Sequence, residues 1–120
     1  MKEELLNLAK QRRSIYALGK QVDQDNNEIA TLIKETMKAA PSAFNSQTTR
    51  AVIAFGEGHD QVWKIVRAAL RKVVEDDDAF AKTSAKIDSF KAAYGTVLYF
   101  TDTDIVHNLE KQFPSYADNF

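Results

Sequence analysis

Two short polar segments carry the side chains of this sequence that are best suited to chemistry. The first is Arg12-Arg13-Ser14, which offers two guanidinium groups followed by a hydroxyl. Arginine matches phosphate oxygens with paired hydrogen bonds, so this segment is suited to holding a phosphate or another anion. The alternative is a solvated helix end, where cations also interact favourably with the helix dipole. The residues alone leave both interpretations open.

The second segment is the polar stretch from Pro41 to Arg50, which contains Ser42, Asn45 and Gln47. Loops between rigid elements often carry binding groups, and side-chain amides offer both a donor and an acceptor. This loop is therefore suited to the polar edge of a flat heterocycle. The alternative is a loop whose side chains only bond their own backbone. Taken with the arginine pair, it suggests an anionic ligand with an amide-like ring.

Other polar residues do not form a recognisable catalytic or metal-binding pattern. The acidic run 75–78 lacks the spacing of a calcium loop, so we interpret it as a solvated turn with a helix cap. His59 and His107 each stand alone, and we expect both at the surface. Gly56-Glu57-Gly58 is not a dinucleotide-binding glycine motif. We therefore predict neither a metal site nor a catalytic nucleophile.

Composition places the chain among ordinary globular proteins. It has 120 residues, of which 44% are hydrophobic and 28% charged, so we expect a single domain over residues 1–120. The net charge of -1 disfavours nucleic-acid binding through Arg12, Arg13 and Lys20, and gives no attraction to anionic membranes. The chain lacks cysteine, a signal-peptide pattern at its N-terminus and an apolar run of about 20 residues. We expect a soluble cytoplasmic protein.

Apolar residues repeat at helical spacing in five places. They predict helices over about 3–11, 28–40, 59–74, 78–93 and 103–113. Oxygen-bearing side chains precede three of these helices, and we expect caps from Asn26 or Asn27, from Asp77 or Asp78, and from Asp102 or Thr103. Gly95 is expected just past the end of the fourth helix.

Two short apolar runs, 51–55 and 96–101, predict β-strands, and the first is expected to be buried on both faces. Two strands leave unpaired sheet edges, and an isolated pair is only marginally stable. We therefore expect a fold that is incomplete or that a partner subunit completes.

In this order, the motifs resemble the nitroreductase family of flavin-dependent oxidoreductases. The matching residues are Arg12-Arg13-Ser14-Ile15-Tyr16 and, after the second helix, Ala40-Pro41-Ser42-Ala43-Phe44-Asn45-Ser46-Gln47. The continuation Thr48-Thr49-Arg50 is similar to the branch named for fatty-acid-repression-mutant proteins, whereas many other members have Pro-Trp there. The stretches 86–91 and 112–120 also look like that branch. The resemblance implies an α+β fold with helices around a mainly antiparallel sheet.

The resemblance also implies a cofactor, FMN, with NAD(P)H as electron donor and a nitroaromatic, quinone or similar compound as acceptor. By position, Arg12, Arg13 and Ser14 match residues that hold the FMN phosphate and ribityl chain. Ser42, Asn45 and Gln47 match residues that meet the isoalloxazine ring, often from the other subunit of a homodimer. Lys91 lies near where members place a cation by the pyrimidine edge of the flavin.

Members of the family continue well beyond the position of Phe120. We therefore expect a truncated nitroreductase-like domain that keeps two strands of the sheet and part of the FMN site. Two functional hypotheses follow. The chain is an FMN-dependent NAD(P)H oxidoreductase, or it is a non-catalytic fragment whose exposed apolar faces drive self-association.

Overall fold

The computed structural model describes all residues from 1 to 120 and has five α-helices and two strands. The helices are α1 (Lys2–Gln11), α2 (Asn26–Ala39), α3 (Glu57–Val73), α4 (Asp77–Lys91) and α5 (Thr103–Gln112). The strands are β1 (Thr49–Phe55) and β2 (Gly95–Thr101), and 3-10 turns occupy Ala43–Asn45 and Pro114–Asn119. The predicted α+β class, with its five helices and two strands, is confirmed.

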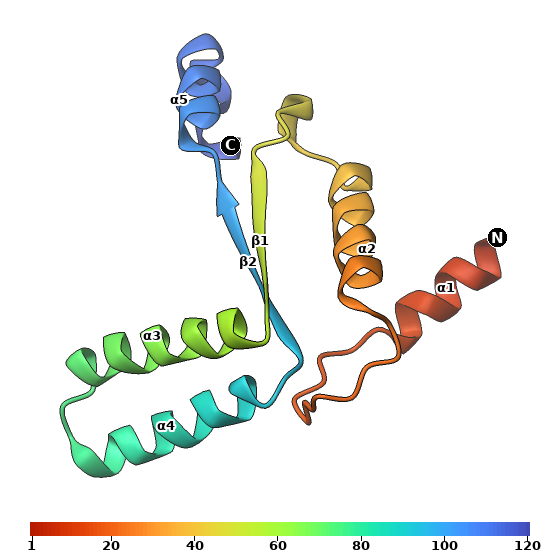
Figure 1. The fold of residues 1–120 in the computed structure, drawn as a ribbon. Coiled ribbons are helices and arrows are strands. Elements are labelled where there is room, and N and C mark those ends of the chain that lie inside the picture. The colour runs from red at the N-terminus through yellow and green to blue at the C-terminus, as the bar shows by residue number, and fades with distance from the viewer.

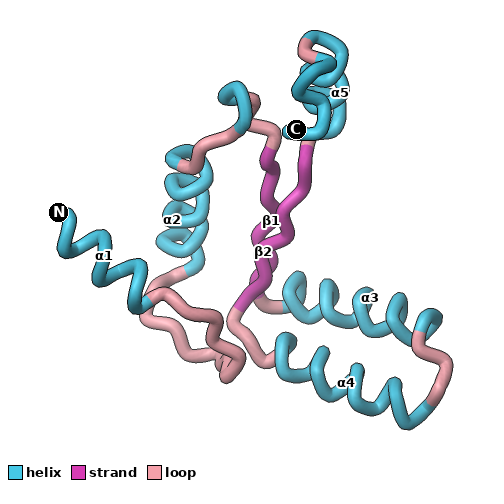
Figure 2. The backbone as a smooth tube through the Cα atoms, turned by 180° about the vertical axis from the view of Figure 1, so that it is seen from behind, coloured by secondary structure: helices cyan, strands magenta, loops and turns pink.

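A two-stranded antiparallel ribbon forms the centre of the molecule (Figure 1). Its register pairs Thr49 with Thr101 at one end and Phe55 with Gly95 at the other. The helical hairpin of α3 and α4 connects the strands at the second end, while α5 continues from β2 at the first (Figure 2). The ribbon thus separates the hairpin from α5, and α2 runs beside β1.

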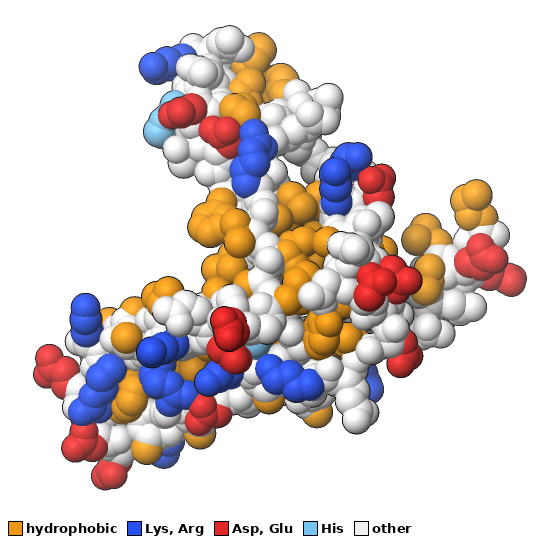
Figure 3. Space-filling model, viewed as in Figure 1, with side chains coloured by type: hydrophobic (Ala, Val, Ile, Leu, Met, Phe, Trp, Pro, Cys, Tyr) orange, Lys and Arg blue, Asp and Glu red, His pale blue; other side chains and the backbone are white.

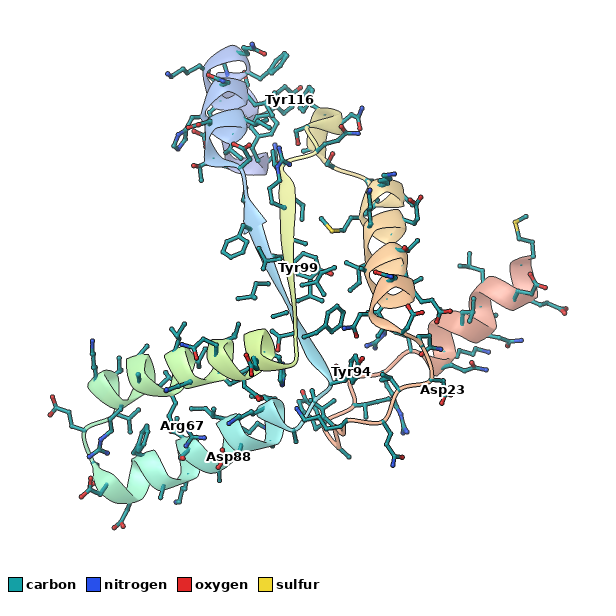
Figure 4. All side chains as sticks on the ribbon, viewed as in Figure 1. Asp23, Arg67, Asp88, Tyr94, Tyr99 and Tyr116 are labelled. Carbon is teal, nitrogen blue, oxygen red and sulfur yellow. The ribbon has the colours of Figure 1, made fainter.

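The prediction that β1 is buried on both faces is wrong. Val52 is 54% exposed, and Tyr99 on the opposite face of the ribbon is 60% exposed (Figure 4). Ala54 is buried, because α3 begins immediately after this end of the strand and packs against it. A ribbon of two strands flanked by so few helices leaves its remaining side chains half-buried or exposed.

The hairpin of α3 and α4 holds most of the packed interior. Ile87 of α4 is 3% exposed, and Trp63 of α3 packs its ring 5.3 Å from that of Phe90. Arg67 of α3 donates to Ser84 and pairs with Asp88, which ties the two helices together (Figure 4). The apolar stripes predicted for these helices therefore face each other.

Three helices begin at aspartate caps. Asp25 and Glu28 form a reciprocal capping box at the start of α2, so the predicted caps Asn26 and Asn27 are wrong by one or two positions. Asp76, rather than Asp77 or Asp78, accepts from the Ala79 N–H at the start of α4. This places a helix cap in the acidic run, as expected.

Asp102 caps α5, which confirms one of the two predicted residues. Gly95 does not follow the end of α4 directly; it is the first residue of β2, because Ala92 already ends the helix. No helix is long and apolar enough to cross a membrane.

His59 lies in the interior, so its predicted surface position is wrong. Its side chain is completely buried at the start of α3, where Nδ1 lies 2.7 Å from Thr96 Oγ1. The other ring nitrogen, Nε2, lies 2.9 Å from the Lys91 carbonyl oxygen. These two partners satisfy the imidazole, which makes burial of this polar ring tolerable. His107 is exposed, as expected.

The chain is open, and much of its apolar surface is uncovered. Its accessible surface is 9779 Å², whereas a folded monomer of 13.5 kDa has about 6,500 Å². The radius of gyration is 18.5 Å, against about 13.6 Å for a compact domain of this length. Hydrophobic side chains gather along the strand ribbon and beside α2 (Figure 3). The expected exposure of apolar faces is therefore confirmed for this chain.

Candidate functional site

The loop between α2 and β1 has a defined conformation set by its own hydroxyl. Ser42 Oγ accepts the backbone N–H of Gln47 at 3.0 Å, which closes the loop around the 3-10 turn Ala43–Asn45. The side chains of Asn45 and Gln47 are exposed, and Ser42 is half-buried. Ser42 thus shapes the loop from within, while the two amides face outward.

Three residues of this loop adopt left-handed backbone angles. Phe44, Asn45 and Gln47 have φ of 53°, 52° and 52°. Asparagine tolerates this region, but a bulky residue such as phenylalanine rarely adopts it. Such strain persists only where the surroundings enforce it, and it is concentrated at functional sites. The loop conformation is therefore imposed by its neighbours.

A cluster of aromatic rings helps to hold the loop in this conformation. The Phe44 ring stacks on Phe113 with centroids 4.9 Å apart, and meets Tyr116 at 5.7 Å and Phe120 at 5.5 Å. These partners belong to the segment that follows α5, which Figure 4 shows beside the turn. Packing of Phe44 against them holds its backbone in the left-handed region.

An ion pair and its hydrogen bonds also hold the loop in this conformation. Arg50 Nη1 donates to the Gln47 carbonyl at 2.7 Å, and its Nη2 pairs with Asp102 at 3.2 Å. The Asp102 N–H in turn donates to the Thr48 carbonyl at 2.8 Å. Gln47 is consequently fixed at both its N–H and its carbonyl, so its side chain leaves the backbone in a set direction.

A hollow of about 240 Å³ opens beside this loop. Hydroxyl groups from the loop line one side, and residues from α5 and the C-terminal turn line the other. The lining residues are Pro41, Ser42, Ala43, Ser46, Thr48, Thr49, Val106, Asn119 and Phe120. It is a polar recess next to two exposed amides, which suits part of a polar heterocycle.

The Arg12-Arg13-Ser14 cluster lies elsewhere in the chain. All three residues are exposed, in the segment between α1 and α2. Figure 1 shows this segment at the N-terminal end of α2, whereas the 41–49 loop follows its C-terminal end. A helix of 14 residues is about 20 Å long, so the two clusters are well separated within one copy.

Lys91 lies at the same end of the molecule as Arg12, Arg13 and Ser14, which we call the arginine cluster. It lies away from residues 41–49, the amide loop. It is the last residue of α4, and its carbonyl oxygen accepts a hydrogen bond from Lys20 Nζ at 3.0 Å. The structure thus brings the segment 12–25 and Lys91 to one end of the molecule. Ser42, Asn45 and Gln47 lie at the other end.

Sequence reasoning missed the residues that hold the amide loop. In the sequence, Arg50 is only part of a motif, and Asp102 is only a helix cap. Their positions in the sequence give no sign of the ion pair, because 52 residues separate them. Phe113 looks like an ordinary apolar residue of a helix, so its stack on Phe44 was equally hidden.

Comparison with known proteins gives a consistent result. The sequence model described as the nitroreductase family matches residues 9–119. Two proteins of Saccharomyces cerevisiae are similar: HBN1 is 36% identical over 111 residues, and the nitroreductase FRM2 is 32% identical over 118. These matches cover 91% and 96% of the chain but 54% and 57% of the relatives. The chain therefore spans about half the length of the curated relatives it matches.

The structure is also similar to that of the nitroreductase CinD from Lactococcus lactis, at 43% identity. Structures of CinD have been solved in complex with chloramphenicol, nicotinic acid and 4-nitrophenol, and their TM-scores to this chain are 0.78, 0.79 and 0.76. The superpositions cover 96% of this chain and 56–57% of CinD.

Proposed function

This chain belongs to the nitroreductase family, in its fatty-acid-repression-mutant branch, and we propose that it acts as an FMN-dependent NAD(P)H oxidoreductase. The chemistry that FMN supplies is transfer of a hydride from NAD(P)H towards a nitroaromatic, quinone or similar acceptor. Two of the CinD ligands, chloramphenicol and 4-nitrophenol, are nitroaromatic compounds, which supports this acceptor class.

The observation that carries the proposal is the strained loop with its two presented amides. Ser42 and Arg50 bond the Gln47 backbone from both sides, so Gln47 is held before any ligand arrives. Asn45 has an exposed side chain in the same loop. Amide groups fixed in this way match the alternating donors and acceptors along the edge of a flavin ring. Holding them in advance lowers the ordering cost of binding.

The donor set at the other cluster fits the phosphate of FMN. Arg12, Arg13 and Ser14 are consecutive exposed residues, and neither arginine is paired with a carboxylate. Their hydrogen-bonding capacity is therefore available to phosphate oxygens. We assign to these residues the phosphate and ribityl contacts. To Lys91, which lies at the same end of the molecule, we assign a cationic contact with the pyrimidine edge of the ring.

The separation of the two clusters supports assembly as a homodimer. Residues 12–14 do not line the hollow beside Ser42, so one copy does not enclose a flavin between both clusters. The surface exceeds that of a compact monomer by roughly 3,000 Å² per copy, or about 6,000 Å² for two copies, which is the scale of the largest permanent dimer interfaces. We propose that the amide loop of one copy meets the ring of a flavin whose phosphate is held by the other. The chain's own residues then bind and orient the cofactor, and none acts as a nucleophile.

The test is NAD(P)H oxidation by the FMN-loaded protein with 4-nitrophenol as acceptor. We expect Arg12→Ala to weaken FMN binding by about 1.5–3 kcal/mol, because a hydrogen bond to a charged group is lost. Lys10→Ala is the matched control, since it removes an exposed cation from the neighbouring helix. Equal FMN affinity in Arg12→Ala and Lys10→Ala would reject the phosphate assignment. Absence of acceptor-dependent oxidation with saturating FMN would reject the oxidoreductase.

A further inference from the structure

Lys20 joins two parts of the chain that are far apart in sequence. Its ammonium group donates to the Lys91 carbonyl at 3.0 Å and to the Ala93 carbonyl at 2.7 Å. The last carbonyls of a helix lack partners within the helix and carry the negative end of its dipole, so a cation is favoured there. Lys20 therefore fastens the segment between α1 and α2 to the end of α4.

The segment itself has little else to define its path. Residues 12–24, which precede the capping box of α2, are exposed throughout, and their backbone makes few hydrogen bonds: Arg12 donates to Leu8, and Leu18 to Tyr16. One further side-chain contact links the segment to α4, because Lys86 Nζ lies 4.9 Å from the centroid of the Tyr16 ring. A cation–π contact at an exposed site is weak, so it supports the attachment without replacing it.

The Lys91 carbonyl that accepts from Lys20 has a second partner, His59. His59 Nε2 lies 2.9 Å from the same Lys91 oxygen, and a carbonyl can only accept, so Nε2 carries the proton. His59 Nδ1 then accepts from Thr96 Oγ1, which itself accepts from Trp63 Nε1 at 2.9 Å. This buried network fixes the end of α4. Lys20 thus attaches the segment between α1 and α2, which makes few hydrogen bonds, to the end of α4, which the buried network holds in place.

We propose that Lys20 is a positioning residue for the arginine cluster. By fastening its own segment to the Lys91 carbonyl, it sets where Arg12, Arg13 and Ser14 stand relative to Lys91. The residues assigned to the phosphate are thereby held at a fixed distance from Lys91, which is assigned to the ring. This inference rests on the proposed function, because the contact matters for binding only if these residues hold FMN.

The first measurement compares the Kd values of FMN and riboflavin, which differ by the phosphate. We expect Lys20→Met to weaken FMN binding about tenfold and riboflavin binding by a clearly smaller factor, because both flavins lose ribityl contacts but only FMN also loses the charge-assisted phosphate contacts. Lys20→Arg keeps the cation and should restore FMN binding, and Lys10→Met is the matched control. Equal losses for both flavins would indicate a purely structural role and overturn the proposal, as would an unchanged FMN affinity.

The second measurement needs no flavin. An arginine-specific protease should cut flavin-free Lys20→Met after Arg12 and Arg13 several times faster than it cuts the wild type or Lys10→Met. Unchanged cleavage in Lys20→Met would overturn the attachment even if the wild type binds FMN. If the wild type binds neither flavin, the proposed function fails, and the cleavage rates alone still decide whether Lys20 fastens the segment.

Discussion

Replacing Thr96 by valine tests the buried network at the base of the strand ribbon. Thr96 Oγ1 accepts from Trp63 Nε1 at 2.9 Å and lies 2.7 Å from His59 Nδ1. Valine has nearly the same shape but no hydroxyl, so the change leaves the packing in place and removes both hydrogen bonds. Two polar groups would then lose their partners, one of them on a completely buried ring.

An unpaired buried polar group costs about 1–3 kcal/mol, and Trp63 is only half-buried, so we expect Thr96→Val to lower the free energy of unfolding by about 2–4 kcal/mol. Denaturant unfolding measures this as a lower midpoint with an unchanged slope. Thr101→Val is the matched control, because Thr101 is an exposed residue of the same strand. It should change the stability by no more than about 0.5 kcal/mol. Equal stability of the two variants would refute the reasoning that the His59 network stabilises the fold.

Three further substitutions probe the helix ends, the hairpin and the loop. Asp25→Ala removes the capping box of α2 and should cost about 1 kcal/mol in denaturant unfolding, whereas Asn27→Ala, one of the caps that the sequence suggested, should cost less than half of that. Ile87→Ala leaves a cavity between α3 and α4 and should cost about 2–4 kcal/mol; a loss below 1 kcal/mol would contradict the burial of this side chain. Ser42→Ala removes the acceptor of the Gln47 N–H and should weaken riboflavin binding about as much as FMN binding, because it acts at the ring; a loss confined to FMN would oppose this assignment.

Helices and strands that are determined by residues close together in the sequence could be predicted from it. The apolar spacing of α3 from Val62 to Leu70 marks the face that packs against α4, although Val73 at the end of this stripe is 77% exposed, and the short run 51–55 marks a strand. The capping residues were harder to predict, because several neighbouring side chains carry a suitable oxygen. At α2 the distinguishing signal was Glu28, which lies three residues after Asp25 and completes the capping box. The spacing of Asp25 and Glu28 therefore identifies the cap from the sequence.

Features that depend on distant partners could not be predicted in the same way. His59 follows a glycine at a helix start and looks like a surface residue, yet its partners lie 32 and 37 residues away. Likewise, the types of Arg12 and Gln47 suggested a ligand, but nothing in the sequence gives their separation. The structure shows that α2 stands between them, so the two clusters lie apart within one copy.

The most direct test of the account is FMN binding measured together with the mass of the protein in solution. Titration of FMN into the purified chain, followed by absorbance and light scattering, reports both quantities on one sample. The account predicts one FMN per chain in a particle of twice the 13.5 kDa chain mass. A colourless protein that fails to take up added FMN would contradict it, and self-association without flavin would instead match the non-catalytic alternative.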